Sequence, residues 1–303
     1  MNGVQKELVS HIRDYDYETV CGTSGNTFPE EYEIPRENTG TLKDQGSVGA
    51  CVAEVIAQIA ESWYSKQTNE PSEMSEGFIY GAFRKANWTS DGMIVSAALD
   101  FWREIGTLPK DYFDVLEEMP EMQKILAKFP EFYEIASKYK ISGYVTFGGF
   151  NEKRDKEIKA ALMNYNYGLV AVSDDYFRGG GHCIQLTGWN DKTGKYKFKN
   201  SWGDSYGDKG FGEIPKNEVN KVYLPLFEEI KLPFTDVVKE TDWFYNDVKQ
   251  MYFAGLMKGT SETTFEPDKP LTRAEAAALF NRHNKEIDTR FDILSRVLEE
   301  KYG

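Results

Sequence analysis

Cysteine and histidine are the scarcest reactive residues in this 303-residue chain, which contains three of each. The cysteines are Cys21, Cys51 and Cys183, so any disulfide would leave one thiol over, and none of them has the spacing of a metal-ligand set. The sequence therefore predicts a fold that does not depend on oxidation, and neither a metal nor a cofactor is expected.

Long apolar runs and clustered basic residues are also missing. No apolar segment approaches the length that spans a membrane, and the first residues lack the basic segment and apolar run of a secretory signal. The formal net charge of -13 argues against nucleic acid as a partner, because phosphate binding needs clustered Lys and Arg. We expect synthesis in the cytosol, so a place at a cell surface or in a virion would require export by a non-classical route.

The chain has ample material for a core, because 40% of its residues are hydrophobic and 14% are aromatic. A chain of this length accommodates one large domain and a smaller one. The composition changes near 232–234, from which we predict a first domain over 1–230 and a helical second domain over 231–303. The first domain would begin with an arm that is extended at 28–35.

The first domain has the pattern of an α+β fold. Helical periodicity is found in three segments. The first directly follows Cys51, and the other two cover 95–105 and 152–165. From residue 168 onward, alternating apolar residues indicate strands. The segment 109–139 is expected to be an irregular insertion, because Pro120 and Pro130 interrupt its helical turns.

Cys51 stands at the expected start of the first helix, directly after a Gly-rich turn that carries Gln45. Unpaired N–H groups and the helix macrodipole at such a position favour a thiolate. The alternative is that Cys51 is simply a small buried residue of the core. A catalytic role requires a base and further hydrogen-bond donors from elsewhere in the chain.

A predicted hairpin around the turn 190–194 supplies those groups. Its two strands place His182 and Asn200 where they can meet. Cys51 would attack as the nucleophile, His182 would act as base and later as acid, and Asn200 would orient the imidazole. Gln45 and the Cys51 backbone N–H would form an oxyanion hole. The alternative for His182 is a histidine with satisfied hydrogen bonds near the core.

These motifs resemble the papain family of cysteine peptidases. The segments that carry the likeness are the nucleophile loop 45–51, the histidine strand 181–184 and the Asn-Ser-Trp-Gly segment within 199–203. His182 and Asn200 follow Cys51 by 131 and 149 positions, and the family places them roughly 130 to 150 positions downstream. The resemblance implies a two-lobed fold with a helical lobe, a β-rich lobe and a substrate cleft between them.

The resemblance also implies several substrate contacts. Gly92 would bind the substrate backbone, and Met93 would line a side-chain pocket. Trp202 would shield the imidazole–asparagine hydrogen bond from water and, with Gly181, would border the substrate.

Departures from the family pattern affect what can be carried over. Val48 stands where the family usually has a disulfide-bonded cysteine, which fits a reducing compartment. Val52 replaces the usual aromatic residue after the nucleophile, and Gly181 replaces a larger residue, so substrate preference does not carry over. Only the residues before Phe28 are available for the family's long inhibitory propeptide, and we expect control by location, by a partner or by the chain's own termini.

The segment 234–275 resembles a different family, the S-layer homology module. Such modules are helical, commonly act in threes and hold anionic cell-wall polysaccharides. The resemblance implies glycan contacts from Trp243 and Arg273, whereas the alternative places Trp243 in a core and Arg273 in a salt bridge at a helix start. A single copy predicts a homotrimer, and the absent secretory signal fits a particle that is assembled in the cytosol and later meets a bacterial wall.

The sequence as a whole predicts a cysteine endopeptidase that acts through an acyl-enzyme on Cys51, positioned at a bacterial cell wall or in a phage particle. Two other functions stay open. One is a structural or glycan-binding protein whose peptidase domain is catalytically silent. The other is an amidase or acyl-transferase that acts on a cell-wall peptide.

Overall fold

The computed structural model describes residues 27–68, 72–83, 91–177, 179–229, 231–239 and 241–302. The chain divides into two compact units. The first ends at Phe227, and the second comprises Tyr64–Ser72 and Glu228–Gly303. No pattern in the sequence indicates that residues 64–72 group with the second unit. Cys21 lies outside the described residues.

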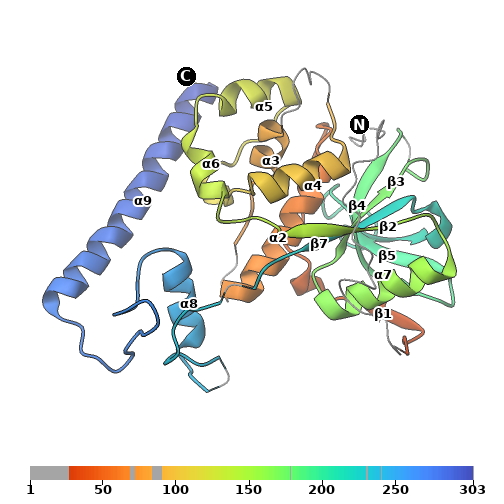
Figure 1. Cartoon of the computed structure of the whole chain (residues 1–303). Helices are drawn as coiled ribbons and strands as arrows, with labels where there is room; N and C mark the ends of the chain where they lie inside the picture. The colour runs from red at the N-terminus through yellow and green to blue at the C-terminus, as the bar shows by residue number, and fades with distance from the viewer. Residues whose placement is uncertain are drawn as a thin grey trace. The chain divides into compact units, whose positions relative to one another are not determined.

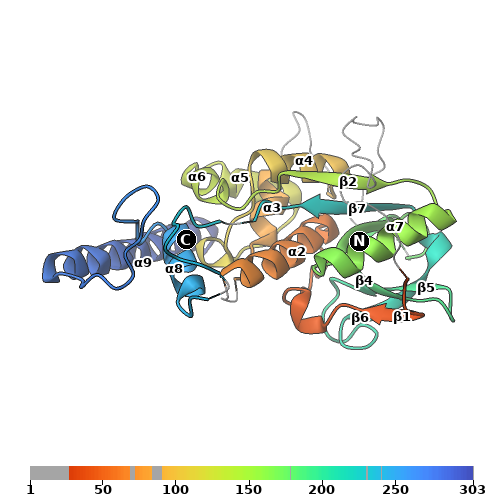
Figure 2. The same ribbon diagram turned by 60° about the horizontal axis from the view of Figure 1, so that its bottom comes forward.

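An antiparallel sheet forms one part of the first unit, with strands that spread from β2 to β6 in Figure 2. Within the described residues the sheet has seven strands in the order β2-β7-β3-β4-β5-β6, and β1 pairs with β4 off this path. The strands are β1 Glu31–Glu33, β2 Gly143–Phe147, β3 Leu169–Ser173, β4 His182–Asn190, β5 Lys195–Lys199, β6 Phe211–Pro215 and β7 Lys221–Leu226.

Strand β4 organises this sheet because three strands pair with it. On one edge β3 pairs with residues 182–186 and β1 pairs with residues 188–190, and β5 pairs along the other edge. Gly188 permits the close approach of β1, since a Cβ there would lie 2.1 Å from the Tyr32 carbonyl oxygen. The predicted hairpin is confirmed, because β4 and β5 are joined by the turn 191–194. β5 is shorter than expected and ends one residue before Asn200.

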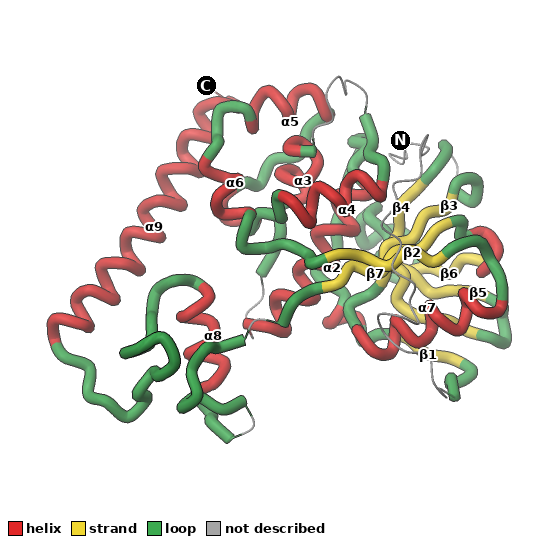
Figure 3. The backbone as a smooth tube through the Cα atoms, viewed as in Figure 1, coloured by secondary structure: helices red, strands yellow, loops and turns green. Residues whose placement is uncertain are grey.

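Helices form the other part of the first unit, on the opposite side from most of the sheet (Figures 1 and 3). The helices are α2 Cys51–Thr68, α3 Glu76–Ala82, α4 Val95–Glu104, α5 Met119–Leu126, α6 Glu131–Ala136 and α7 Glu152–Tyr165, with the short 3-10 helices Arg36–Asn38, Lys110–Tyr112 and Lys216–Glu218. Helix α7 instead packs on β2 and β4. The α+β class and the three predicted helices, now α2, α4 and α7, are confirmed.

The expectation of an irregular insertion at 109–139 is wrong. Two helices form there, and a proline that was expected to interrupt a helix lies at the start of each. Pro120 lies in the first turn of α5, and Pro130 is the N-cap of α6. The first turn of a helix needs no N–H from these positions, and the fixed φ of proline suits it. Prolines at these points therefore start helices rather than break them.

The core of the first unit is built around α2. Its residues Val52, Val55, Ile56 and Ile59 are fully buried, as the helical spacing after Cys51 predicts. Burial of each such side chain contributes about 1.5 to 3 kcal/mol to folding. This anchoring fixes the position of the helix start, where Cys51 lies.

The second unit contains α8 Tyr245–Phe253 and α9 Arg273–Tyr302. Its core consists of Phe234, Val237, Tyr245 and Val248, against which Leu232, Phe244 and Phe265 pack. A capping box starts α9, since Glu275 accepts a hydrogen bond from the Thr272 N–H and the Thr272 hydroxyl accepts one from the Glu275 N–H. Helix α9 runs without a break from Arg273 to Tyr302. None of the helices in the described part of the chain is long and apolar enough to span a membrane.

Candidate active site

The loop before α2 holds Cys51 at the first position of the helix. The Val48 N–H donates to the Gln45 carbonyl oxygen at 3.0 Å, and the Gln45 Nε2 donates to the Val48 carbonyl oxygen at 2.8 Å. Gly46 has a φ of 55°, in the left-handed region that favours glycine. The loop thereby folds on itself and delivers a fully buried Cys51 to a helix N-terminus, where a thiolate is stabilised.

The segment that follows β5 is joined directly to this loop. The Gln45 N–H donates to the Ser201 carbonyl oxygen at 2.9 Å, and the Gly203 N–H donates to the Lys43 carbonyl oxygen at 3.1 Å. Ser201 Oγ donates to Gln45 Oε1 at 2.6 Å. Position 203 requires glycine, because its φ is 69° and because an added Cβ would lie 2.9 Å from Asp44 Oδ2. These contacts place Asn200, at the end of β5, next to the cysteine loop.

His182 and Asn200 form the hydrogen bond that the hairpin predicts. His182 Nε2 lies 2.7 Å from Asn200 Oδ1. The same oxygen accepts the Ser201 N–H at 2.9 Å, which fixes it as the amide oxygen rather than the nitrogen. His182 Nε2 must therefore carry the hydrogen, which leaves Nδ1 as the basic nitrogen. Nδ1 has no hydrogen-bond partner among the residues that the structure describes.

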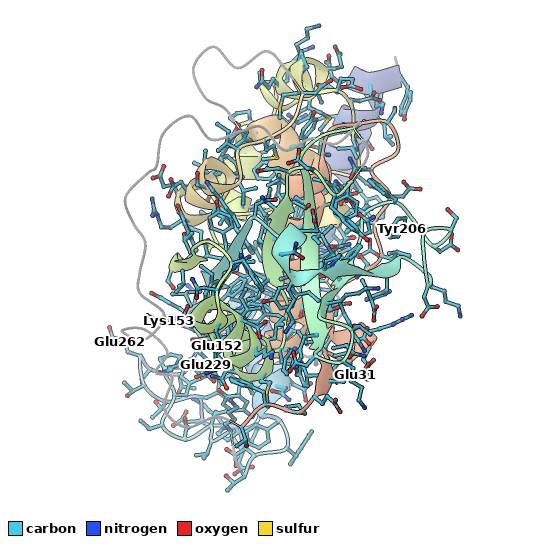
Figure 4. All side chains as sticks on the ribbon, turned by 90° about the vertical axis from the view of Figure 1, so that its right-hand side faces the viewer. Glu31, Glu152, Lys153, Tyr206, Glu229 and Glu262 are labelled. Carbon is cyan, nitrogen blue, oxygen red and sulfur yellow. The ribbon has the colours of Figure 1, made fainter. Side chains whose placement is uncertain are left out.

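Aromatic rings enclose the imidazole. Trp202 stacks on His182 with a centroid separation of 4.6 Å, and Phe177 meets the ring edge-on at 4.7 Å. Tyr206, which Figure 4 labels, packs edge-on against Trp202 at 5.1 Å. Burial lowers the pKa of His182 to about 4, although the hydrogen bond to Asn200 acts in the opposite direction. An imidazolium at this position therefore requires an anion beside it.

Cys183 follows His182 on β4 and is the second buried thiol of this unit. Burial raises the pKa of the Cys183 thiol well above its usual value, and the negative charge of Cys51 raises it further. Both cysteines are buried and neither is in a disulfide. Cys183 stays protonated, so Cys51 at the helix start is the better candidate for a thiolate.

Two buried lysines support the loops on which these residues lie. Lys43 Nζ lies 2.7 Å from Glu61 and 3.1 Å from Glu76. Lys199 Nζ donates to three carbonyl oxygens at 2.6 to 3.1 Å, those of Thr39, Gly40 and Thr41. The sequence shows that Lys43 and Lys199 lie beside the two motifs. It does not indicate their partners, because those residues lie far away in the chain.

The expected substrate residues precede α4 or border the imidazole. The Gly92 N–H donates to Tyr80 Oη at 3.3 Å, and Met93 is fully buried. Gly181 and Trp202 are half-buried on either side of the histidine and asparagine. The part of Gly92 and Met93 in substrate binding stays a prediction.

In the second unit, the alternative that Trp243 belongs to a core is wrong, because its side chain is 88% exposed. Arg273, the first residue of α9, is also exposed. No group of three or more His, Cys, Asp and Glu side chains in the described part of the chain could hold a metal ion.

Two family models match the sequence. The model of the papain family of cysteine proteases matches residues 28–225, and the model of the S-layer homology domain matches residues 233–277. The second match identifies an S-layer homology domain in the second unit.

Characterised relatives are distant. A cysteine protease from Blomia tropicalis is 23% identical over 201 residues, which cover 58% of this chain and 57% of that protein. A viral cathepsin from Adoxophyes honmai nucleopolyhedrovirus is 23% identical over 200 residues, which cover 62% and 58% of the two chains. The chain thus spans less than two thirds of the length of these relatives.

Solved structures show the same fold. Xylellain, a cysteine protease from Xylella fastidiosa, matches with a TM-score of 0.59 and 18% identity over 75% of this chain and 96% of that chain. The procathepsin L2 proteinase from the larval midgut of Tenebrio molitor matches with a TM-score of 0.57 and 18% identity over 75% and 78%. The papain-like fold that the sequence predicts is therefore confirmed.

Proposed function

The chain belongs to the papain family of cysteine proteases, and we propose that it hydrolyses peptide bonds through an acyl-enzyme formed on Cys51. The observation that carries this proposal is the double use of Asn200 Oδ1, which accepts from both His182 Nε2 and the Ser201 N–H. This arrangement fixes the imidazole with Nδ1 as its basic nitrogen. Nδ1 is then the atom that takes the proton of the Cys51 thiol.

The reaction begins when Cys51 transfers its proton to His182 Nδ1 and the thiolate sulfur attacks the carbonyl carbon of the substrate. The imidazolium then gives that proton to the leaving amine, and the C–N bond breaks. A water molecule next gives a proton to Nδ1 and attacks the thioester, which releases the acid and restores the thiol. Nε2–H stays bonded to Asn200 throughout and prevents the ring from rotating.

The His182 imidazolium and the Cys51 thiolate stabilise each other electrostatically. Burial alone keeps His182 neutral, because it lowers the pKa to about 4. The imidazolium is therefore stabilised by the Cys51 thiolate, and the thiolate is stabilised in turn by the imidazolium and the N-terminus of α2. Aromatic rings that exclude water strengthen this attraction.

The oxyanion of the tetrahedral intermediate would be bound by the Cys51 backbone N–H and the Gln45 side-chain amide. The Ser201 hydroxyl donates to the oxygen of that amide, and the Val48 carbonyl oxygen accepts from its nitrogen, which fixes its orientation before substrate arrives. Preorganised donors of this kind are most effective when they need no rearrangement during the reaction.

A thiol-directed epoxide probe tests the nucleophile. We expect it to label the wild-type protein and Cys183→Ala, because the Cys183 thiol is buried and protonated, and to leave Cys51→Ala unlabelled. Labelling that persists in Cys51→Ala would refute the proposal. A wild-type protein that is neither labelled nor active would instead support the catalytically silent alternative.

The substrate class has two candidates that share this chemistry, a protein chain and a cell-wall stem peptide. We propose a protein or peptide substrate. Fluorogenic peptides and purified peptidoglycan, assayed side by side, separate the two. Release of stem peptides from peptidoglycan without cleavage of any peptide would assign amidase activity instead.

The S-layer homology domain is proposed to hold the protein at a bacterial cell wall or on a phage particle, through anionic wall polysaccharide. The exposed indole of Trp243 and the guanidinium of Arg273 support this role, because sugars stack on aromatic faces and guanidinium binds anions. Since such domains commonly act in threes, association of three chains is part of the proposal. Cosedimentation with purified cell walls should be lost in Trp243→Ala and retained in the control Val238→Ala, another exposed residue of the same unit.

A further inference from the structure

Helix α9 continues well beyond both family matches and carries an exposed apolar stripe. The S-layer homology match ends at residue 277, whereas the helix ends at Tyr302. Five large apolar side chains on it are between 37% and 73% exposed, namely Phe280, Ile287, Phe291, Leu298 and Tyr302. They contribute nothing to the core of their own unit.

These five residues follow one another at intervals of seven, four, seven and four positions. At about 100° per residue, they fall within an arc of roughly 60° on one side of the helix. Asn284 lies on the same arc and Leu294 lies about 20° beyond it. With these two residues, the positions from Phe280 to Leu298 follow alternating four- and three-residue steps. Such a repeat is the seam of a coiled coil.

We propose that this seam is a self-association surface, on which α9 of a second copy of the chain packs in parallel and in register. A heptad seam is self-complementary, since the same residues from two copies meet along it. Asn284 would face its own counterpart, and an amide pair inside an apolar seam fixes the register. This inference concerns residues outside both family matches and does not depend on the proposed catalytic activity.

Charges on the flanks favour the parallel arrangement. His283 and Asp288 border the seam on opposite sides and are five residues apart. In a parallel coiled coil, flanking residues that are five positions apart meet across the two helices, so His283 of one copy lies beside Asp288 of the second copy. The His283 ring can therefore donate to the Asp288 carboxylate of the second copy, once on each side.

The exposed area also fits a protein partner. The five side chains expose on the order of 500 Å² of apolar surface, taking roughly 200 Å² for each aromatic ring. A patch of this size is among the largest that monomers usually expose, and such patches often mark interaction sites. A standard interface of about 800 Å² per partner would include the flanking residues as well. A lipid surface fits less well, because α9 carries six acidic and six basic residues and lacks the basic bias of membrane-binding helices.

Sedimentation equilibrium of the full chain in a Cys51→Ala background, which prevents self-digestion, tests the proposal. We expect concentration-dependent association of the parent and a loss of more than about 100-fold in its association constant for Ile287→Asp/Phe291→Asp, because two carboxylates would be buried in the seam. Met163→Asp is the matched control, since Met163 is an exposed apolar residue on α7, away from the seam. It should associate like the parent.

A disulfide test assigns the register. With Cys21→Ser also present, Asn284→Cys should form an intermolecular disulfide on mild oxidation, and the neighbouring Lys285→Cys, which lies off the seam, should not. A monomeric parent at high micromolar concentration would overturn the proposal, as would association that survives in Ile287→Asp/Phe291→Asp. Equal cross-linking of both cysteine variants would also overturn it, and so would a monomer that binds phosphatidylglycerol vesicles through the stripe.

Discussion

Ser201 donates its hydroxyl hydrogen to the side-chain oxygen of Gln45 at 2.6 Å, across 156 residues of sequence. This bond holds the Gln45 amide so that its nitrogen points away from Ser201. Loss of the bond should therefore disturb the oxyanion hole without removing the nucleophile or the base.

We expect Ser201→Ala to lower kcat about tenfold with little change in KM, and Gln45→Ala to lower kcat by about 10² to 10³, because oxyanion stabilisation acts in the transition state. Steady-state kinetics on a fluorogenic peptide measure both. Ser205→Ala, in the same loop, is the control and should retain full activity. An unchanged kcat in Gln45→Ala would mean that the oxyanion is bound elsewhere.

His182 should make stability depend on pH on the acid side. Burial lowers its pKa to about 4, against 6.5 for the unperturbed group. Between these values the unfolded chain binds more protons than the folded chain, so the free energy of unfolding should fall as pH falls from 6.5 to 4. The loss should amount to roughly 2 to 4 kcal/mol.

Urea denaturation across this pH range should show a weaker pH dependence in Cys51→Ala/His182→Gln than in Cys51→Ala. Both proteins lack the thiolate, so the comparison isolates the imidazole. Identical slopes in the two proteins would contradict the burial of a neutral histidine.

Replacing Glu54 and replacing Glu61 with an apolar residue should have opposite effects on stability. Glu61 accepts hydrogen bonds from the Thr41 N–H and hydroxyl and from the Met74 N–H, and pairs with Lys43. Neither carboxyl oxygen of Glu54 has a hydrogen-bond partner within the described residues. Burial raises the pKa of Glu54 well above 4.5, and the charge of Glu76 raises it further.

The folded chain therefore holds a proton on Glu54 that the unfolded chain releases above about pH 4.5, and stability is lost as pH rises beyond that value. At pH 7, Glu54→Leu should increase the free energy of unfolding by about 1 to 3 kcal/mol, and Glu61→Leu should decrease it by about 3 to 5 kcal/mol. Urea denaturation measures both. A destabilised Glu54→Leu would show that this carboxyl has a role in the fold.

Loss of the Lys199 ammonium should destabilise the fold far more than loss of the nearby Lys197 ammonium. Its ammonium is the shared donor to the three carbonyl oxygens of residues 39–41, and Lys199→Met should cost about 2 to 4 kcal/mol of stability because those oxygens lose their donor. Lys197 instead forms ion pairs with Glu31, which is 54% exposed, and with Glu33, which is partly exposed, so Lys197→Met should cost less than about 1 kcal/mol. Equal losses in thermal or urea unfolding would contradict the distinction.

The sequence predicts those parts of this protein that depend on local periodicity. Helices α2 and α7 and the β4–β5 hairpin follow from apolar spacing, and the hairpin in turn predicts the meeting of His182 with Asn200. Helices α5 and α6 were not predicted, because a proline starts or breaks a helix according to its position in the first turn. The position is fixed only once the flanking residues pack.

The supporting charges escape prediction for a different reason. Lys43 and Lys199 look like solvated residues beside two motifs, and their partners are set by contacts over 18 to 160 residues. Spacing carries no information about such pairs.

The cysteine loop and the histidine–asparagine hairpin meet through backbone hydrogen bonds between residues 43–45 and 201–203. A ribosome synthesising this chain releases Cys51 long before His182, and domains fold as units once their residues have emerged. The nucleophile therefore lacks its base while the 131 residues up to His182 are synthesised. On the proposed mechanism, a nascent chain would become able to cleave peptide bonds only after nearly the whole peptidase unit has been made.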